Sequence, residues 1–350
     1  MRLTLLRTVL FSALLLASIA AAQPVTYFVP ISQRTVPGTG SAPAPTIVLP
    51  DPGVGADQSI LFNTSQGVAT PFLLGSLAAT SLSGVPTPAA AVAAAPGVLV
   101  KGRSRTLVAV VSGSAVRFGT LEGGVFVARG PTVTLPGSAP IGLSARADGG
   151  ATLLVSDSTG TTLTRWEIDA SGDIAVAFQR GSGGVSVVND PAQALYLDDQ
   201  AGFAYAGTSL GNLVLLNPAL DAGVGTVVDS AQTGQGRLAA PINGLDLYGG
   251  TAQAAYLLVS NAQGLTIYDL NSANARASAF RVIAQDSFGS ITAPSGVVVT
   301  NLPAGARQPQ GAIALGDPAQ RGLALLSWET LATKVDGGLS TDTTFDPRGP

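Results

Sequence analysis

The chain has 350 residues, contains no histidine and no cysteine, and only 11% of its residues are charged. These absences exclude disulfides, thiolate zinc sites, cysteine nucleophiles, histidine-ligated metals and a Ser-His-Asp triad. The functional groups that remain are carboxylates, hydroxyls, amides, guanidinium groups and two lysines. Any bound metal would therefore be a hard cation held by oxygen ligands, such as calcium or magnesium. With a formal net charge of −3, the chain has no basic surface for nucleic acid.

The first 22 residues have the three-part pattern of a secretory signal peptide. Arg2 and Arg7 form a short basic region, an apolar run follows from Thr8, and small residues end at Ala22 before Gln23. We expect cleavage after Ala22 and an exported protein, either secreted or periplasmic. No later segment has 18 unbroken apolar residues, so we expect no membrane span after cleavage.

A repeated unit of three short β-strands follows along the chain. Each unit has a leading strand and then a strand, a turn rich in glycine or polar residues, and another strand. The leading strands are expected at 141–145, 194–197 and 242–247, and the hairpins after them at 152–169, 203–216 and 256–270. Gly142, Ala194 and Gly244 match one another in these leading strands and lie 52 and 50 residues apart. A period near 50 residues with three or four strands is typical of propeller blades.

These patterns predict an all-β fold, a β-propeller of six blades with about four short antiparallel strands each. We expect the propeller over residues 56–333, after a lead-in rich in proline and glycine at 23–55 and before a polar tail at 334–350 that frays. A β-sandwich, or a pair of them, is the alternative because even strand spacing fits both architectures. The regular step of about 50 residues favours the propeller.

Aspartates at expected strand ends and turns are the chemical candidates. They are Asp57, Asp157, Asp198, Asp199, Asp246, Asp269 and Asp317. Turn carboxylates and backbone carbonyls can bind calcium, although aspartate is also a common turn residue that bonds its own backbone. The adjacent pair Asp198 and Asp199 would repel each other, and a nearby cation would relieve that repulsion.

Three segments carry a resemblance to a known family. They are "QALYLDDQAG" at 193–202, "INGLDLY" at 242–248 and "YLLVSNAQGLTIYD" at 256–269. In order and spacing these segments are similar to motifs of the β-propeller phytases, and fainter similarities extend the resemblance over 56–333. Those proteins are secreted, calcium-dependent, six-bladed phosphatases of phytate. The resemblance therefore implies calcium as cofactor, phytate or another phosphorylated small molecule as ligand, and a monomer.

The resemblance also implies a set of metal ligands. In the family, acids at the channel mouth hold several calcium ions, which bind phosphates together with lysines and arginines, and a bridging water attacks one phosphate. The residues of this chain that fall on such positions are Asp57, Asp198, Asp199, Gln263 and Asp317. The resemblance identifies no catalytic or phosphate-binding side chain.

Several acidic positions of the family are replaced in this chain. The replacements are Gln58, Gln193, Gly207, Asn243 and Ser295. A bridged calcium cluster needs several carboxylates to offset its charge. Two hypotheses follow: a phytase-like, calcium-dependent phosphomonoester hydrolase, or a catalytically inactive exported propeller that acts as a binding or surface scaffold.

Overall fold

The architecture was obtained from a computed structural model of the chain. It describes residues 24–35, 42–134, 141–169, 177–179, 185–186, 190–217, 219–220, 225–233, 237–251, 254–272, 278–342 and 345–348. The predicted signal segment at 1–22 lies outside the described residues. In the described part of the chain, no helix has the length and apolar character needed to cross a membrane.

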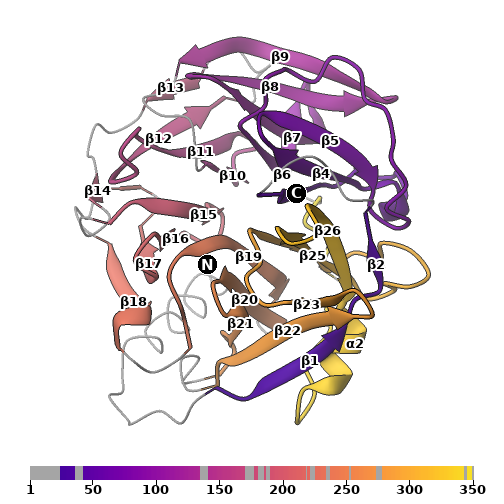
Figure 1. The fold of residues 1–350 in the computed structure, drawn as a ribbon. Helices are drawn as coiled ribbons and strands as arrows, with labels where there is room; N and C mark the ends of the chain where they lie inside the picture. The colour runs from indigo at the N-terminus through magenta and orange to yellow at the C-terminus, as the bar shows by residue number, and fades with distance from the viewer. Residues whose placement is uncertain are drawn as a thin grey trace.

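The protein is an all-β, six-bladed propeller, as the repeat predicted (Figure 1). Blade 1 contains β3 (Ala44–Val48), β4 (Ile60–Ser65) and β5 (Val68–Leu73). Blade 2 contains β6 (Ala91–Val100), β7 (Arg103–Ser112), β8 (Ala115–Glu122) and β9 (Val125–Thr134). Blade 3 contains β10 (Ile141–Ala145), β11 (Ala151–Ser156), β12 (Thr162–Ile168), β13 (Ala177–Gln179) and β14 (Val185–Ser186).

The second half of the chain forms the other three blades. Blade 4 contains β15 (Ala192–Asp198), β16 (Phe203–Thr208), β17 (Asn212–Leu216) and β18 (Thr226–Ser230). Blade 5 contains β19 (Ile242–Thr251), β20 (Ala254–Asn261), β21 (Gly264–Asp269), β22 (Phe280–Asp286) and β23 (Gly289–Ile291). Blade 6 contains β24 (Val297–Thr300), β25 (Ala312–Asp317) and β26 (Gly322–Ser327). Short 3₁₀ turns lie at Ala56–Gln58 and Ala231–Thr233.

The first strand of each blade lies at the centre of the ring. These inner strands are β3, β6, β10, β15, β19 and β24, and each contacts the next around a closed circle. Neighbouring inner strands run in the same direction. For example, the start of β19 lies beside the start of β24, where a Cβ atom added to Gly244 would lie 2.6 Å from the Val297 nitrogen. We call the end where inner strands begin the amino end of the ring, and the end where they finish the carboxyl end.

The hydrophobic core is divided into six parts, one between each pair of neighbouring blades. The face of one blade packs on the face of the next, which requires strands buried on both sides. For this reason β11, β16, β25 and β26 are buried at every residue. The strand β25, for example, has five residues without a polar side chain, "AIALG", before its final Asp317, instead of an alternating pattern.

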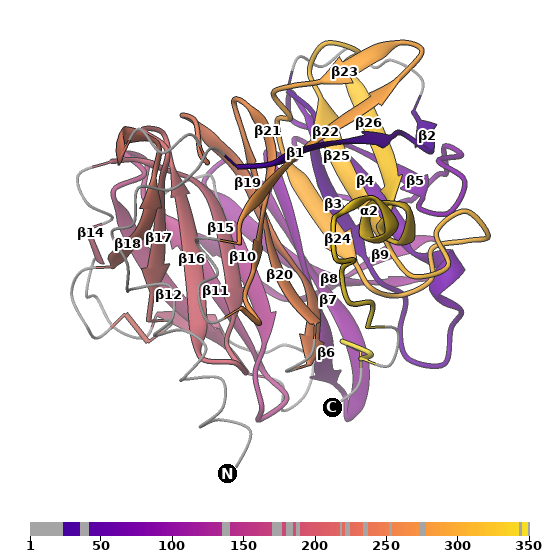
Figure 2. The same ribbon diagram turned by 90° about the horizontal axis from the view of Figure 1, so that it is seen from below.

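The lead-in at 23–55 contributes strands to three blades. β1 (Thr26–Pro30) pairs in parallel with the outer strand β22, and β2 (Gln33–Arg34) pairs antiparallel with β26. β3 is itself an inner strand, so the boundary expected at residue 56 divides blade 1. Figure 2 shows β1 and β2 crossing the outer side of blades 5 and 6. Because β2 joins the first part of the chain to the last blade, it closes the ring.

The tail after blade 6 is packed against the propeller, contrary to the fraying expected from its composition. Helix α2 (Trp328–Lys334) begins with a cap from Ser327 and buries Trp328 completely. The Trp328 ring stacks on Tyr248, with ring centroids 3.5 Å apart and planes 7° apart. Farther on, Asp342 is buried, and Asn301 donates a 2.8 Å hydrogen bond to its carbonyl oxygen.

Candidate functional site

The six inner strands surround a channel with a volume of about 490 Å³. Its wall is built mostly from small and aliphatic side chains. Among them are Ala91, Ala93, Ala94, Leu143, Leu195, Leu197, Leu245, Leu247 and Val297. Pockets of this size that combine apolar side chains with polar groups are typical of small-molecule sites. We take this channel as the candidate site.

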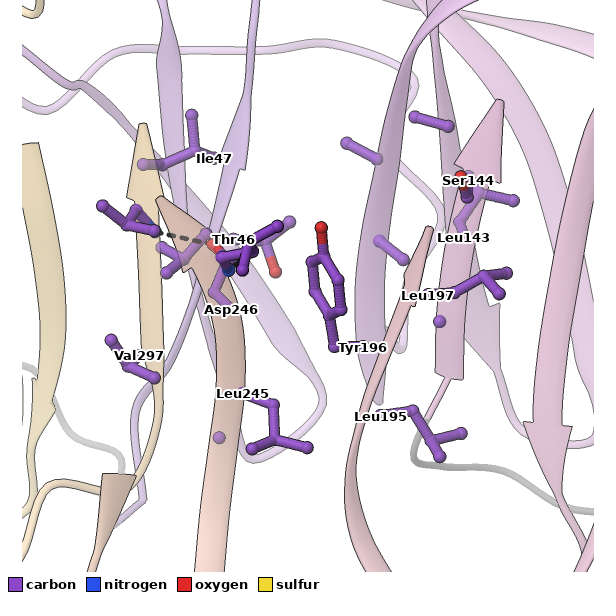
Figure 3. A pocket seen from close by; sticks show the side chains of 18 of the residues that line it. Thr46, Ile47, Leu143, Ser144, Leu195, Tyr196, Leu197, Leu245, Asp246 and Val297 are labelled. Atoms are coloured by element: carbon purple, nitrogen blue, oxygen red, sulfur yellow. Dashed lines mark hydrogen bonds between the residues drawn. The ribbon is translucent and has the colours of Figure 1, made fainter. Parts of the chain in front are cut away.

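Two polar side chains of the wall come from the middle of inner strands. Tyr196 of β15 and Asp246 of β19 each lie two residues after the matched positions Ala194 and Gly244. Both strands also have a pairing irregularity just before those matched positions, so Tyr196 and Asp246 occupy equivalent levels in neighbouring blades. Figure 3 shows the Tyr196 ring directed into the space between β15 and β19, with Asp246 on the β19 side.

Thr46 and Ser144 add hydroxyl groups to the same region of the channel (Figure 3). The Thr46 hydroxyl donates a 2.9 Å hydrogen bond to the Val92 carbonyl oxygen. The Ser144 hydroxyl accepts a 3.1 Å hydrogen bond from the Asp199 amide. Both hydroxyls therefore tie one inner strand to the next blade while they line the cavity.

Asp246 is hydrogen-bonded to the backbone of the neighbouring inner strand β24. Its carboxylate accepts a 2.6 Å hydrogen bond from the Val299 amide of β24 and a 2.9 Å bond from the Leu247 amide. The described residues include no ion-pair partner for it. Burial raises the pKa of Asp246 to about 7, and the two amides oppose that shift. The carboxyl group thus changes its charge near neutral pH.

Sequence reasoning placed Asp246 among acids at strand ends or turns, whereas it lies inside β19. A signal was present: Asp246 interrupts the apolar stretch of "INGLDLY", and it stands at the repeat position that Tyr196 occupies one blade earlier. Tyr196 itself was not recognised as a site residue.

The tail lies at the carboxyl end of the channel. Phe345 and Pro347 line the cavity, and Asn301, just after β24, also donates to the Phe345 carbonyl oxygen. Arg348 donates to the Val54 carbonyl oxygen and its own carbonyl accepts from the Ser104 hydroxyl, both at 2.8 Å. The described residues of this segment therefore contact blades 6, 1 and 2 at the carboxyl end.

The five predicted metal ligands do not come together as one set. Asp57 is exposed in the loop after β3, Asp198 ends β15 and Asp199 follows it, so these three lie at the carboxyl end. Gln263 follows β20 and Asp317 ends β25. Both strands run antiparallel to the inner strands and end at the amino end. Across the described ranges, no group of three or more acidic side chains is arranged to hold a metal ion.

Four of the five predicted ligands have partners within the protein. Asp198 accepts a 2.8 Å hydrogen bond from the Ala201 amide in its turn, and Asp199 accepts from Arg165 at 2.9 Å. Gln263 accepts from Arg281. Asp317 forms an ion pair with Arg34, which also binds Asp286. These contacts are those of hairpin turns and of the closure between blades 5 and 6.

No protein-family model matches the chain, and no curated protein matches it. Among solved structures, the chain is similar to the WD40 domain of Neurospora crassa Pan2. The TM-score is 0.43 and the identity is 14%, over 82% of this chain and 90% of that one. The comparisons assign no family to the protein.

Proposed function

We propose that this protein is an exported propeller that binds a small molecule in its central channel and does not catalyse a reaction. The observation that carries this proposal is the channel of about 490 Å³ with Tyr196, Asp246, Thr46 and Ser144 along its wall. Its volume lies in the range of small-molecule pockets, and its few polar groups would orient a ligand. Export rests on the signal pattern at residues 1–22.

A calcium-dependent phosphomonoester hydrolase, acting on phytate or a similar ligand, is the second candidate function. The sequence resemblance to the propeller phytases supports it. Metal-assisted attack on a phosphate needs cations that generate hydroxide and neutralise the phosphoryl oxygens. Asp57, Asp198 and Asp199 lie at one end of the ring and Gln263 and Asp317 at the other, and none of the described residues that line the channel is lysine or arginine. These features favour the binding protein.

A channel-filling substitution tests the first proposal. Ala93 lines the channel on β6, so Ala93→Trp is expected to remove much of its volume. Ala78 is exposed and does not line the channel, which makes Ala78→Trp the matched control. Small organic molecules that raise the melting temperature of the wild type should not raise that of Ala93→Trp, because a ligand stabilises only the state it binds.

The control and a graded variant complete the experiment. Ala78→Trp should respond to ligands as the wild type does, and Ala93→Leu should give an intermediate response. Equal responses of the wild type and Ala93→Trp would show that the channel is not the binding site.

Phosphate release separates the two candidate functions. We expect no release of phosphate from phytate above a blank at saturating calcium. Calcium alone should also leave the melting temperature unchanged, since no group of three acids among the described residues is arranged to bind it. Calcium-dependent release by the wild type would replace the binding proposal with the hydrolase.

A further inference from the structure

We propose that the ligand of the central channel is a small organic cation, an apolar molecule with one ammonium group that pairs with Asp246 and lies against the ring of Tyr196. This inference rests on the proposed binding function and names the class of ligand. The charges of the wall, the free positions of the Asp246 carboxylate and the aromatic ring beside it support the proposal independently.

The charge of the wall selects the sign of the ligand. Among the described lining residues, Asp198 and Asp246 are the only charged side chains, and both are acids. Asp198 is the last residue of β15 and accepts a hydrogen bond within the turn that follows, whereas Asp246 lies in the middle of β19. Since no cation of the wall balances Asp246, the channel attracts a positive ligand and repels an anionic one. A phosphate ester would meet no basic side chain among the described lining residues.

The Asp246 carboxylate has positions left for a ligand. Its two oxygens offer about four acceptor positions. The Val299 and Leu247 amides use two of them, and both amides belong to inner strands, so they hold the carboxylate in place at the wall. An ammonium donor can use the remaining positions and would form a charge-assisted hydrogen bond. The side chain is therefore fixed before the ligand arrives.

Tyr196 supplies an aromatic face for the same cation. Its ring projects into the channel between β15 and β19, at the level equivalent to that of Asp246 (Figure 3). A ring face attracts an ammonium group within about 6 Å of its centre, most strongly where water is excluded. The aliphatic wall, with Leu195, Leu197 and Leu245, then suits the apolar body of the ligand. This combination disfavours a hydrated metal ion, which needs six or more oxygen ligands.

A matched series of probes tests the inference on the full chain. Cyclohexylamine, cyclohexanol and cyclohexanecarboxylate share one apolar body and differ in their polar group. At pH 8 the amine is protonated, and Asp246, with a pKa of about 7, is mostly ionised. We expect the amine to bind the wild type about tenfold more tightly than the alcohol, and the carboxylate to bind most weakly. Titration calorimetry or ligand-observed NMR measures these affinities.

Two substitutions assign the preference to its residues. Asp246→Asn should remove the preference for the amine over cyclohexanol, because it removes the negative charge and keeps an oxygen that accepts from the Val299 amide. Tyr196→Leu should lower the affinity for the amine about fivefold, whereas Tyr196→Phe, which keeps the aromatic ring, should leave that affinity unchanged.

The results of these experiments distinguish a failure of the cation proposal from a failure of the binding function on which it rests. Equal binding of amine and alcohol, or an amine preference that survives Asp246→Asn, would overturn the cation proposal and leave a channel that binds neutral molecules. If none of the probes binds, or if Ala93→Trp binds them as the wild type does, the binding function fails and the inference fails with it.

Discussion

Two carboxylates in neighbouring blades, one buried and one half-buried at the channel, differ in their surroundings. Asp229 of β18 lies between blades 4 and 5, where it accepts a 2.9 Å bond from Arg237 and a 2.8 Å bond from the Tyr268 hydroxyl. The Asp229 side chain is 1% exposed and the Arg237 side chain 4%. Asp246 of β19 faces the channel and accepts only from backbone amides among the described groups. The first is paired with a cation and the second is not.

The comparison separates structural charges from a charge left for a ligand. Six other carboxylates that the structure buries or half-buries have guanidinium partners: Asp51 with Arg105, Glu122 with Arg129, Glu167 with Arg146 and Arg165, Asp199 with Arg165, and Asp286 and Asp317 with Arg34. A chain with only 11% charged residues thus uses its arginines to join strands and blades. Asp190 is buried without a guanidinium partner among the described residues, and it accepts instead from Ser209, Leu210 and Asn212. Asp246 also lacks such a partner, but it lines the channel, where a cationic ligand would pair with it.

The largest expected effect is on the paired carboxylate. Arg237→Ala leaves Asp229 buried without its cation, which typically costs about 3–5 kcal/mol of unfolding free energy. Chemical denaturation of the wild type and the variant measures the difference. The double variant Arg237→Met with Asp229→Leu should recover much of the loss, because it removes both buried charges. If Arg237→Ala lowers the unfolding free energy by less than about 1 kcal/mol, this ion pair stabilises the protein no more than an exposed salt bridge does.

The unpaired carboxylate should make stability depend on pH. Burial raises the pKa of Asp246 from 3.8 to about 7, so the folded state holds a proton that the unfolded chain has lost. The free energy of unfolding should therefore fall as pH rises from 4 to 7, by up to about 1.4 kcal/mol per pH unit, and stay level above that. Asp246→Asn cannot ionise there and should remove this slope.

Other carboxylates give the opposite trend at lower pH. Hydrogen bonds from Arg146 and Arg34 lower the pKa values of Asp148 and Asp286, so their contribution to stability is lost as pH falls below 4. The difference between the wild type and Asp246→Asn isolates the channel group. Parallel pH profiles for the two proteins would mean that Asp246 is ionised throughout and not perturbed.

The closure of the ring gives an intermediate effect. Arg34 on β2 pairs with Asp286 of blade 5 at 2.6 Å and with Asp317 of blade 6. Arg34→Ala should cost about 2 kcal/mol, since it removes hydrogen bonds to charged groups in a half-buried site. Hydrogen exchange should rise in β1, β2 and β26. Arg321→Ala, an exposed arginine at the nearby β25–β26 turn, serves as the control.

Much of the fold was predictable because the blades repeat. The 50-residue step through Gly142, Ala194 and Gly244 placed the leading strands, and the observed β10, β15 and β19 contain these positions. The closure was not predictable in this way. β1 and β2 are short and pair with strands about 250 to 290 residues later, so no local pattern records their partners.

The site was predicted less well than the fold because the sequence does not show in which direction each strand runs around the ring. Asp198 and Asp317 each end an apolar strand, but one strand is the first of its blade and the other the second, so the two residues lie at opposite ends. The relation of Asp246 to Tyr196 was overlooked although the repeat contains it, since each residue lies two positions after a matched residue.

The smallest expected effect concerns the end of the channel that the tail covers. Asn301→Ala removes the bonds from its amide nitrogen to the carbonyl oxygens of Asp342 and Phe345, at a total cost of about 1 kcal/mol. Amide exchange should rise in 340–342 and 345–348 and remain unchanged in the blades. If this segment keeps water from the channel, the variant should also lower the pKa of Asp246 and reduce the fall in stability between pH 4 and 7. An unchanged slope would show that the inner strands alone isolate Asp246 from water.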